Sequence, residues 1–167
     1  MNSDAGQKRP GIPPLALRQF REGDFDELAA LNAYGLAAAG IKAADDYYSD
    51  QDFQDLQNTY AEPAGGTLLV GEINDKIVAM GGIRRTSPSS CELLRMRVYP
   101  QYQGRGYGTL ILESLETAAR QFAYRRITLI TGRDQHPAVD LYAHHGYRTF
   151  KEESLLGIPC VHMAKEL

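Results

Sequence analysis

Apolar and polar residues alternate in short runs along much of the chain, and elsewhere apolar residues recur three or four positions apart. Alternation is typical of strands, and the longer spacing is typical of helices. Strands are expected over residues 15–20, 67–73, 76–84, 92–99, 126–131, 147–151 and 160–164. Helices are expected over residues 24–36, 45–60, 111–122 and 137–145. The pattern predicts an α/β (α+β) fold with one mixed sheet of about seven strands and about four flanking helices.

Turn and capping signals set the ends of several of these elements. Asp24 and Glu27 have the spacing of a capping box at the start of the first helix. Asn74-Asp75 indicates a hairpin. Polar residues 86–90 predict a loop, and residues 157–159 predict the turn between the last two strands. One buried stripe is expected on the third helix, formed by Ile111, Leu115, Ala118 and Phe122.

The organisation of the chain indicates a single domain. Its 167 residues fit one domain of ordinary size, and no internal repeat or dividing linker is visible. Residues 1–14 are polar, contain several Gly and Pro and have no periodicity, so we expect a disordered leader. The domain is then expected to span residues 15–167.

Charge and cysteine content exclude several classes of protein. A net charge of -3 gives no general attraction to nucleic acid or to an anionic membrane, and no basic stripe is present. No apolar stretch reaches the roughly 18 residues that a membrane span needs, and the first residues lack a hydrophobic signal region. The two cysteines, Cys91 and Cys160, form no disulfide framework. We therefore expect a cytoplasmic protein without nucleic-acid or membrane partners.

The glycine-rich segment 104–109 lies between a predicted strand and a predicted helix. A helix N-terminus offers unpaired N–H groups and a positive dipole end, so an anion is stabilised there. Glycines at 104, 106 and 108 let the backbone approach a bulky pyrophosphate, and Arg105 adds a cation. A dinucleotide fingerprint fails because its third glycine would fall at Thr109, and a Walker loop fails because no lysine is present.

The pattern that fits is Gln/Arg-x-x-Gly-x-Gly/Ala, filled by Gln103, Gly106 and Gly108 after Val98-Tyr99-Pro100. This resembles the acetyl-CoA signature of the GNAT superfamily of N-acetyltransferases. A second block, residues 138–147, resembles the family's Ala-Ile/Val-x-Leu-Tyr…Gly-Phe motif about thirty residues later. A flexible turn without a ligand, the alternative, would require neither the strand-to-helix position nor the second block.

The resemblance implies a strongly twisted GNAT-like sheet and acetyl-CoA as the acetyl-donor cosubstrate. It also implies that one strand, preceding the phosphate loop, separates from its neighbour and leaves a gap for the pantetheine arm. The backbone amide of Met96 would polarise the thioester carbonyl, and Val98 would bind the arm. Gln135 stands where the family often has asparagine, and Thr131 could contact the arm instead. The residues expected to bind acetyl-CoA are Met96, Arg97, Val98, Gln103, Gly104, Arg105, Gly106, Tyr107, Gly108, Thr109, Thr131, Gln135 and Tyr142.

Acetyl transfer to an amine requires an acid for the leaving thiolate and removal of a proton from the amine. Tyr142, in the Leu-Tyr pair of the second block, matches the family's general acid, and an unperturbed phenol stays protonated at pH 7. Glu92 is the expected general base, on the strand that carries Met96. Glu72 on the preceding hairpin is a lesser candidate, and many relatives use water chains. The alternatives are a core tyrosine and a solvent-facing glutamate.

The histidines and cysteines do not suggest a metal or a covalent intermediate. His136, His144, His145 and His162 show no His-Glu-x-x-His arrangement, so no metal site is expected. No cysteine stands in a nucleophilic context, which favours direct attack in a ternary complex over an acetyl-enzyme. Cys160 is expected to be buried in a strand.

The acceptor is expected to be a primary amine. Acid and aromatic residues gather in one predicted helix, at Asp45, Asp46, Tyr47, Tyr48, Asp50, Asp52, Phe53, Asp55 and Tyr60. These would suit a cationic small amine or an amino-acid-like acceptor, but a solvated acidic helix with one aromatic face in the core is the simpler explanation. The other readings are a protein or peptide N-acetyltransferase, transfer of another acyl group, and a non-catalytic acetyl-CoA-binding regulatory domain. Both a monomer and a homodimer are compatible with the sequence.

Overall fold

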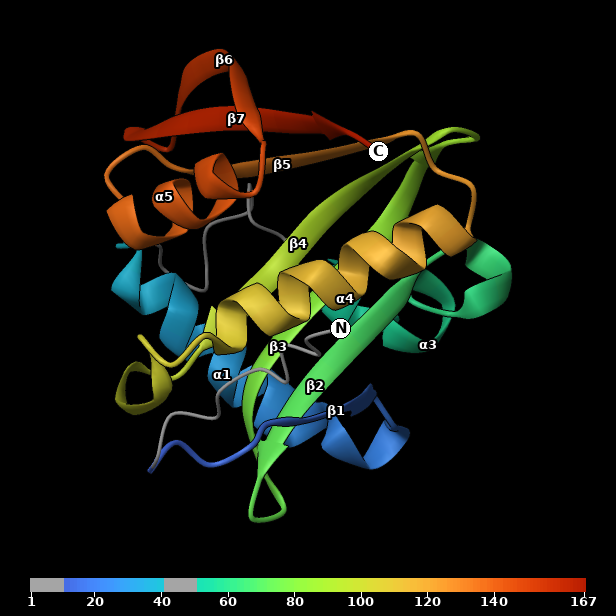
Figure 1. The fold of residues 1–167 in the computed structure, drawn as a ribbon, viewed down its shortest axis with the longest axis vertical. Coiled ribbons are helices and arrows are strands. Elements are labelled where there is room, and N and C mark those ends of the chain that lie inside the picture. The colour runs from blue at the N-terminus through green and yellow to red at the C-terminus, as the bar shows by residue number, and fades with distance from the viewer. Residues whose placement is uncertain (1–10, 41–50) are drawn as a thin grey trace, which may run out of the picture.

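A computed structural model describes residues 11–40 and 51–167 of the chain. Within these residues one seven-stranded sheet has the order β1-β2-β3-β4-β5-β7-β6 (Figure 1). Its strands are β1 (Ala16–Gln19), β2 (Thr67–Ile73), β3 (Lys76–Ser87), β4 (Ser90–Val98), β5 (Arg126–Gly132), β6 (Arg148–Leu155) and β7 (Ile158–Glu166). The α-helices are α1 (Phe25–Ala38), α2 (Gln51–Gln54), α3 (Leu56–Thr59), α4 (Tyr107–Gln121) and α5 (His136–His144). The predicted mixed sheet with flanking helices is confirmed.

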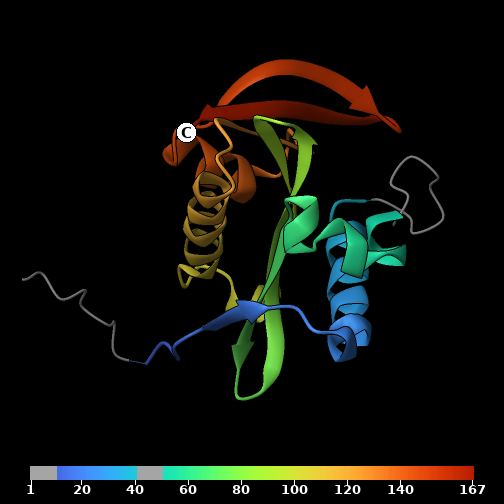
Figure 2. The same ribbon diagram turned by 90° about the vertical axis from the view of Figure 1, so that its right-hand side faces the viewer.

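Helices cover both faces of this sheet. Helices α4 and α5 lie on one face, and α1 to α3 lie on the other (Figure 2). All neighbouring strands pair antiparallel except β4 and β5, which pair in parallel. Parallel neighbours need a crossover connection, and here α4 supplies it. The face with α4 and the face with α1 will be called the α4 face and the α1 face.

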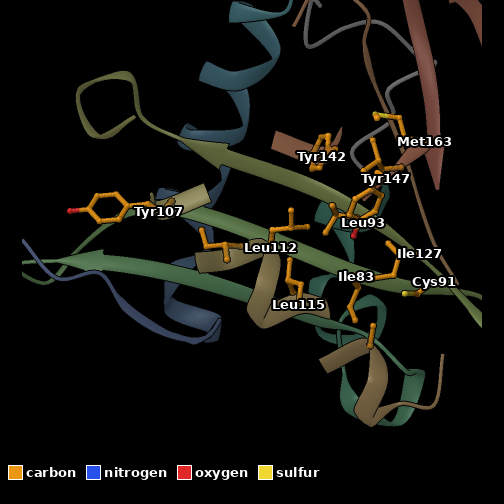
Figure 3. Close-up of a cluster of buried hydrophobic side chains, with 14 of the residues drawn as sticks. Ile83, Cys91, Leu93, Tyr107, Leu112, Leu115, Ile127, Tyr142, Tyr147 and Met163 are labelled. Atoms are coloured by element: carbon orange, nitrogen blue, oxygen red, sulfur yellow. The ribbon is translucent and has the colours of Figure 1, made fainter. Parts of the chain in front are cut away.

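Each face has its own hydrophobic cluster. On the α4 face, Ile83, Cys91, Leu93 and Ile127 from the sheet pack against one side of α4 (Figure 3). On the α1 face, Leu28, Leu31, Leu56 and Tyr60 pack against Leu68, Val70, Ile77 and Met80. The inner side of α4 consists of Ile111, Leu112, Leu115 and Ala119. The predicted stripe is correct at Ile111 and Leu115, whereas Ala118 and Phe122 are only partly buried because the inward line continues through Ala119.

The predicted capping box at Asp24 and Glu27 is wrong. Asp24 instead accepts a hydrogen bond from the backbone N–H of Arg21 at 2.7 Å and closes a short 3-10 helix, Glu22–Asp24. The carboxylate of Glu27 accepts from the backbone N–H of Ile77 at 3.1 Å. A local spacing rule could not anticipate this, because the partner of Glu27 comes from a strand fifty residues away.

Two predicted loops are shorter than expected. Strand β3 continues to Ser87 and β4 begins at Ser90, so the polar loop 86–90 reduces to a tight turn. Ile158 and Pro159 belong to β7, and the turn before it is made by Leu156 and Gly157, which have φ of 52° and 76°. Of the helix expected over 45–60, residues 51–60 form the short helices α2 and α3, and residues 45–50 lie outside the described residues.

The start of the chain contributes to the fold before β1. Ile12 packs against the α4-face cluster, and the carbonyl of Pro13 accepts a hydrogen bond from the hydroxyl of Tyr107 at 2.5 Å. Residues 1–10 of the expected leader lie outside the described residues. Across the described ranges, no helix combines the length and apolarity needed to cross a membrane.

Candidate functional site

The sheet opens between β4 and β5. The two strands pair only at Ser90↔Arg126, Cys91↔Ile127 and Glu92↔Thr128. Beyond this point β5 continues to pair with β7 as far as Gly132↔Cys160, while β4 turns away from β5. Helix α5 lies at the end of the sheet where the two strands separate (Figure 1). A gap in the sheet therefore begins directly after Glu92 and Thr128.

A bulge in β4 explains this divergence. Met80 pairs with Arg97 and Gly82 pairs with Leu94, so Arg95 and Met96 both stand opposite Gly81. Arg95 has a φ of 60°, which is unusual for a residue other than glycine. Such an extra residue bends its strand and locally disrupts the ladder. The bulge lies where the resemblance predicts the carbonyl-binding amide of Met96.

The predicted phosphate loop lies at the N-terminus of α4. Gly104 and Gly106 have φ of 72° and 83°, and Gly106 is the N-cap residue of the helix. A side chain at either position would meet nothing within 4 Å, so both glycines are required by the backbone and neither by packing. The first-turn N–H groups of α4, at Tyr107, Gly108 and Thr109, have no partners within the helix. This arrangement fits a pyrophosphate.

Other side chains of the loop hold it in shape. The side-chain amide of Gln103 donates to the carbonyl of Val98 at 2.9 Å, which ties the loop to the end of β4. The guanidinium of Arg105 donates to the carbonyl of Gln101 at 2.8 Å and lies 5.5 Å from the ring of Tyr102. Gly108 lies near Leu141, so it permits close contact between α4 and α5.

Tyr142 is buried in α5 on the α4 face, near this gap. Its ring lies edge-on to that of Tyr147 with centroids 5.7 Å apart, beside Leu93 of β4 (Figure 3). Burial raises the pKa of the Tyr142 phenol to about 12, although the charge of Arg97 acts to lower it. The phenol is consequently a proton donor at neutral pH.

Arg97 connects the gap with α1. Its guanidinium donates to the carbonyl of Met96 at 3.0 Å, and its side chain packs on Gly35 in α1. A Cβ atom at Gly35 would lie 2.1 Å from Cδ of Arg97, so only glycine leaves room for the arginine. Because Arg97 also acts electrostatically on Tyr142, a cation lies at the gap between α1 and α5.

Gln135 and Thr131 lie at the far end of the gap. Thr131 belongs to β5 opposite Val161, and Gln135 is the N-cap residue of α5. A hollow of about 150 Å³ opens here. It is lined by Ala39, Gly132, Asp134, Gln135, Ile158, Pro159 and Cys160. Residues from α1, β5, α5 and β7 therefore meet at this end of the gap.

The two candidate bases have different surroundings. Glu92 stands on the α1 face, because Cys91 and Leu93 beside it point into the α4-face cluster. Arg84 donates to Oε2 of Glu92 from Nε at 2.9 Å and from Nη2 at 2.8 Å. Glu72 pairs with Ile77, beyond the end of β4, and its carboxylate accepts from Nε of Arg18 at 3.0 Å. Glu92 lies at the gap, and Glu72 lies outside it.

The acidic and aromatic residues of the second helical segment are partly structural. Asp52 and Tyr60 are buried and hydrogen-bonded to each other at 2.6 Å, and Phe53 is buried beside them. Asp55 accepts from the side chain of Asn58. Residues 45–50 of this group lie outside the described residues. The described members therefore agree with the simpler interpretation, a helix with an aromatic face in the core.

Histidines and cysteines provide no metal site or nucleophile in the described parts of the chain. No group of three or more His, Cys, Asp or Glu there is placed to hold a metal ion. Nδ1 of His145 lies 2.8 Å from the carbonyl of Leu141, and His144 is exposed. Burial raises the pKa of the Cys91 thiol to about 12, which makes it inert, and Cys160 is buried in β7.

Sequence reasoning missed the residues whose role depends on distant partners. Arg95 forms the bulge and is bound by Asp52 and Asn32, yet no local signal marks a left-handed arginine in a strand. The pair of Glu153 and His162, joined at 2.5 Å between β6 and β7, was also missed. The positions of polar residues in the last hairpin could have suggested a pair between β6 and β7, but they do not show on which face of the sheet the pair lies.

Comparison with known protein families gives a match over more than half of the chain. The model of the acetyltransferase (GNAT) family matches residues 33–147. The uncharacterized N-acetyltransferase YjgM of Escherichia coli K12 is 29% identical over 115 residues, 66% of this chain and 68% of that protein. N-acetyltransferase 8 of Rattus norvegicus is 28% identical over 102 residues, 58% of this chain and 46% of that protein. The chain thus spans about half the length of this vertebrate relative.

Solved structures share the fold. An acetyltransferase of the GNAT family from Staphylococcus aureus Mu50 superposes with a TM-score of 0.81 at 18% identity, over 92% of this chain and 99% of that one. The PaiA N-acetyltransferase from Thermoplasma acidophilum, solved in complex with coenzyme A, superposes with a TM-score of 0.70 at 15% identity. The latter match covers 92% of this chain and 99% of that one. At these identities the likeness concerns the fold.

Proposed function

The chain belongs to the GNAT acetyltransferase family, and from this premise we propose that it transfers the acetyl group of acetyl-CoA to a primary amine. The transfer is by direct attack within a ternary complex. One observation carries the proposal. The open N-terminus of α4 and the buried phenol of Tyr142 both lie beside the gap that begins after Glu92↔Thr128.

The residues around the gap fit acetyl-CoA. The left-handed Gly104 and Gly106 leave the N-terminus of α4 open to the pyrophosphate, and Arg105 adds positive charge. The interruption of β4–β5 pairing leaves room for the pantetheine arm beside β4, with Val98 at its far end. Gln135 and Thr131 border the arm from α5 and β5. Acetyl-CoA supplies an activated thioester when bound there.

The reaction requires charge stabilisation and one proton donor. The neutral amine attacks the thioester carbon, and negative charge develops on the carbonyl oxygen, which the backbone amide of Met96 stabilises. Collapse of the tetrahedral intermediate breaks the carbon–sulfur bond. The hydroxyl of Tyr142 gives its proton to the departing thiolate. Arg97 lies close enough to lower the cost of the transient phenolate.

The amine must lose a proton, and Glu92 is the acceptor that we propose. It stands on the α1 face at the last β4–β5 pair, directly before the gap. Arg84 binds Oε2, and no described residue donates to Oε1. Oε1 would therefore take the proton, directly or through a water molecule. Glu72 is separated from this opening and is not included.

The experiment that tests the proposal is release of the CoA thiol from acetyl-CoA across a panel of amines. The panel contains polyamines, amino acids, aminoglycosides, arylalkylamines and peptides with free N-termini, and calorimetry measures acetyl-CoA binding in parallel. Turnover with one amine class supports the proposal. Tight binding of acetyl-CoA without turnover on any amine would indicate the regulatory alternative, and absence of binding would contradict the assignment of the phosphate loop.

A further inference from the structure

Three residues form a row across the α1 face at the point where β4 leaves the sheet. Ile130 of β5 is the first residue on this face beyond the last β4–β5 pair, and it pairs with His162 of β7. The ring of Phe150 on β6 lies 5.9 Å from that of His162. The neighbouring residues Leu129 and Met163 point into the α4-face cluster, so Ile130 and His162 point the other way. The row of Ile130, His162 and Phe150 thus borders the gap.

The two outer members of the row, Ile130 and Phe150, are apolar and open to solvent, and the half-buried imidazole of His162 lies between them. Ile130 is 41% exposed in β5, and Phe150 is 54% exposed at the irregularity of β6 between Thr149 and Lys151. Single exposed apolar residues are ordinary, but neighbouring ones beside a hollow are typical of a binding surface. The hollow lined by Gly132 and Cys160 is the next position along the same two strands. The row therefore lies between Glu92 and this hollow.

The ring of Phe150 is held in place despite its exposure. The guanidinium of Arg126 lies 5.4 Å from the centroid of the ring, and His162 contacts the ring edge-on from the neighbouring strand. His162 is in turn fixed by Glu153, whose carboxylate lies 2.5 Å from Nε2. A rigid aromatic surface binds an apolar group at little cost in side-chain entropy.

Charges around the row do not suit a polycation. Lys151 pairs with Glu153 at 2.9 Å, and Arg126 pairs with Glu166 at 2.9 Å. Arg148, opposite Ala164, adds a further positive charge on the same face. A polyamine or an aminoglycoside would therefore meet compensated or like charge here, whereas an apolar group would meet a matching surface.

We propose that the row of Ile130, His162 and Phe150 binds an aromatic or branched apolar group carried by the acceptor amine. The acceptor class is then an arylalkylamine or an amino-acid derivative with an apolar side chain. This inference rests on the proposed function, since the amine is placed at the gap beside Glu92 and its apolar group extends over β5 and β7.

The test compares amines that differ in the apolar group alone. We use 2-phenylethylamine, propylamine and 1,4-diaminobutane as acceptors for the wild type, Phe150→Ser and Ile130→Ser. Both substitutions replace exposed side chains, so the fold should be retained. Phe25→Ser is the matched control, because Phe25 is 46% exposed at the opposite end of α1 from Ala39.

We expect kcat/KM for 2-phenylethylamine to exceed that for the other two amines by at least about tenfold in the wild type. Each row variant should raise KM for 2-phenylethylamine about tenfold and leave KM for propylamine and for acetyl-CoA within about twofold. Phe25→Ser should resemble the wild type. Turnover without this dependence on the apolar group overturns the inference and leaves the proposed function intact.

Binding separates the two proposals if no amine is acetylated. Calorimetric titration of 2-phenylethylamine into protein saturated with CoA measures the acceptor site without chemistry. Binding that Phe150→Ser weakens about tenfold supports the row even in the absence of turnover, whereas binding unaffected by both row variants contradicts it.

Sedimentation of the same proteins tests whether the row is a subunit interface. Conversion of a dimer to a monomer by Phe150→Ser, with KM unchanged, would make the row a subunit interface and overturn the proposal.

Discussion

The guanidinium of Arg95 is bound by the carboxylate of Asp52, with Nε 2.8 Å from Oδ2, and this pair joins the bulge of β4 to α2. Both side chains are almost fully buried, with 10% and 3% of their surfaces exposed. Tyr60 donates to the same carboxylate at 2.6 Å, and Asn32 of α1 accepts from Arg95 at 3.0 Å. One network thus fixes the helices of the α1 face to the strand residue that opens the sheet.

Asp52→Asn should destabilise the protein strongly. Removing one partner of a buried ion pair leaves the other charge uncompensated, which costs about 3–5 kcal/mol of unfolding free energy. Urea unfolding followed by circular dichroism measures the change. Asp55→Asn is the control, because Asp55 is exposed and should change the free energy by less than about 0.5 kcal/mol. Equal effects of the two substitutions would contradict a central role for the Arg95–Asp52 pair.

Acid should weaken the fold through the same carboxylate. Burial by itself raises the pKa of Asp52, but the hydrogen bond and the charge of Arg95, together with the hydrogen bond from Tyr60, lower it overall. A lowered pKa means that the carboxylate stabilises the fold fully above its unfolded pKa of about 3.9 and loses this effect as the pH falls through the folded value. The unfolding free energy should therefore decrease below about pH 4. Urea titrations at successive pH values should show a smaller decrease in Asp52→Asn, and identical slopes would disprove this contribution.

Local patterns were sufficient for much of the fold. The apolar run of β2 and its Asn74-Asp75 turn predicted the strand with its observed bounds, because pairing across a tight turn is specified by neighbours in sequence. Helix α4 and its glycine-rich start were predicted for the same reason. Boundaries were less accurate at β3 and β4, where the ladder extends through polar residues toward Ser87 and Ser90. The strands continue to pair there through backbone hydrogen bonds, although the polar residues at these positions give no sequence pattern typical of a strand.

The candidate site also contains residues that local patterns identify and residues whose surroundings depend on distant parts of the chain. Gly106 and Tyr142 belong to contiguous motifs, so sequence alone singled them out. The surroundings of Glu92 and Arg97 depend on Arg84 and Gly35, which are brought near them only by the folded sheet and by α1. The bulge at Arg95 has no compositional signal, since its left-handed conformation is held by buried partners from other elements. Long-range contacts were therefore beyond prediction from the residues themselves.

Gly35→Ala should impair activity without the usual gain in stability. Alanine in place of glycine inside a helix normally stabilises by about 1 kcal/mol. Here the new methyl group would lie 2.1 Å from Cδ and 2.2 Å from Nε of Arg97, which must move away from the gap. Thermal unfolding and CoA release would both be measured, with Gly23→Ala as the control because nothing lies within 4 Å of that position. A stabilised, fully active Gly35→Ala variant would show that Arg97 is not needed where it lies.

Gly106→Ala should weaken acetyl-CoA binding. The residue has a φ of 83°, so alanine costs about 1–2 kcal/mol in the observed backbone or changes the start of α4. We expect the Kd for acetyl-CoA to rise about tenfold or more, measured by calorimetry. Gly157→Ala is the matched control, since it has a φ of 76° with nothing within 4 Å but lies in the β6–β7 turn. If both variants bind acetyl-CoA alike, backbone strain alone accounts for the result.

Tyr142→Phe should reduce turnover without loss of acetyl-CoA binding, and its pH profile should identify the acid. We expect kcat to fall about 10²–10³-fold while Kd for acetyl-CoA stays within about twofold, because the ring is retained and only the proton is lost. Burial raises the pKa of the phenol to about 12, so the protonated, active form persists to that pH. Wild-type kcat should consequently hold between pH 8 and about 10, where an ordinary phenol would already be half ionised. A decline over this range that disappears in Tyr142→Phe would show that the phenol titrates normally, in contradiction to its buried position beside Tyr147.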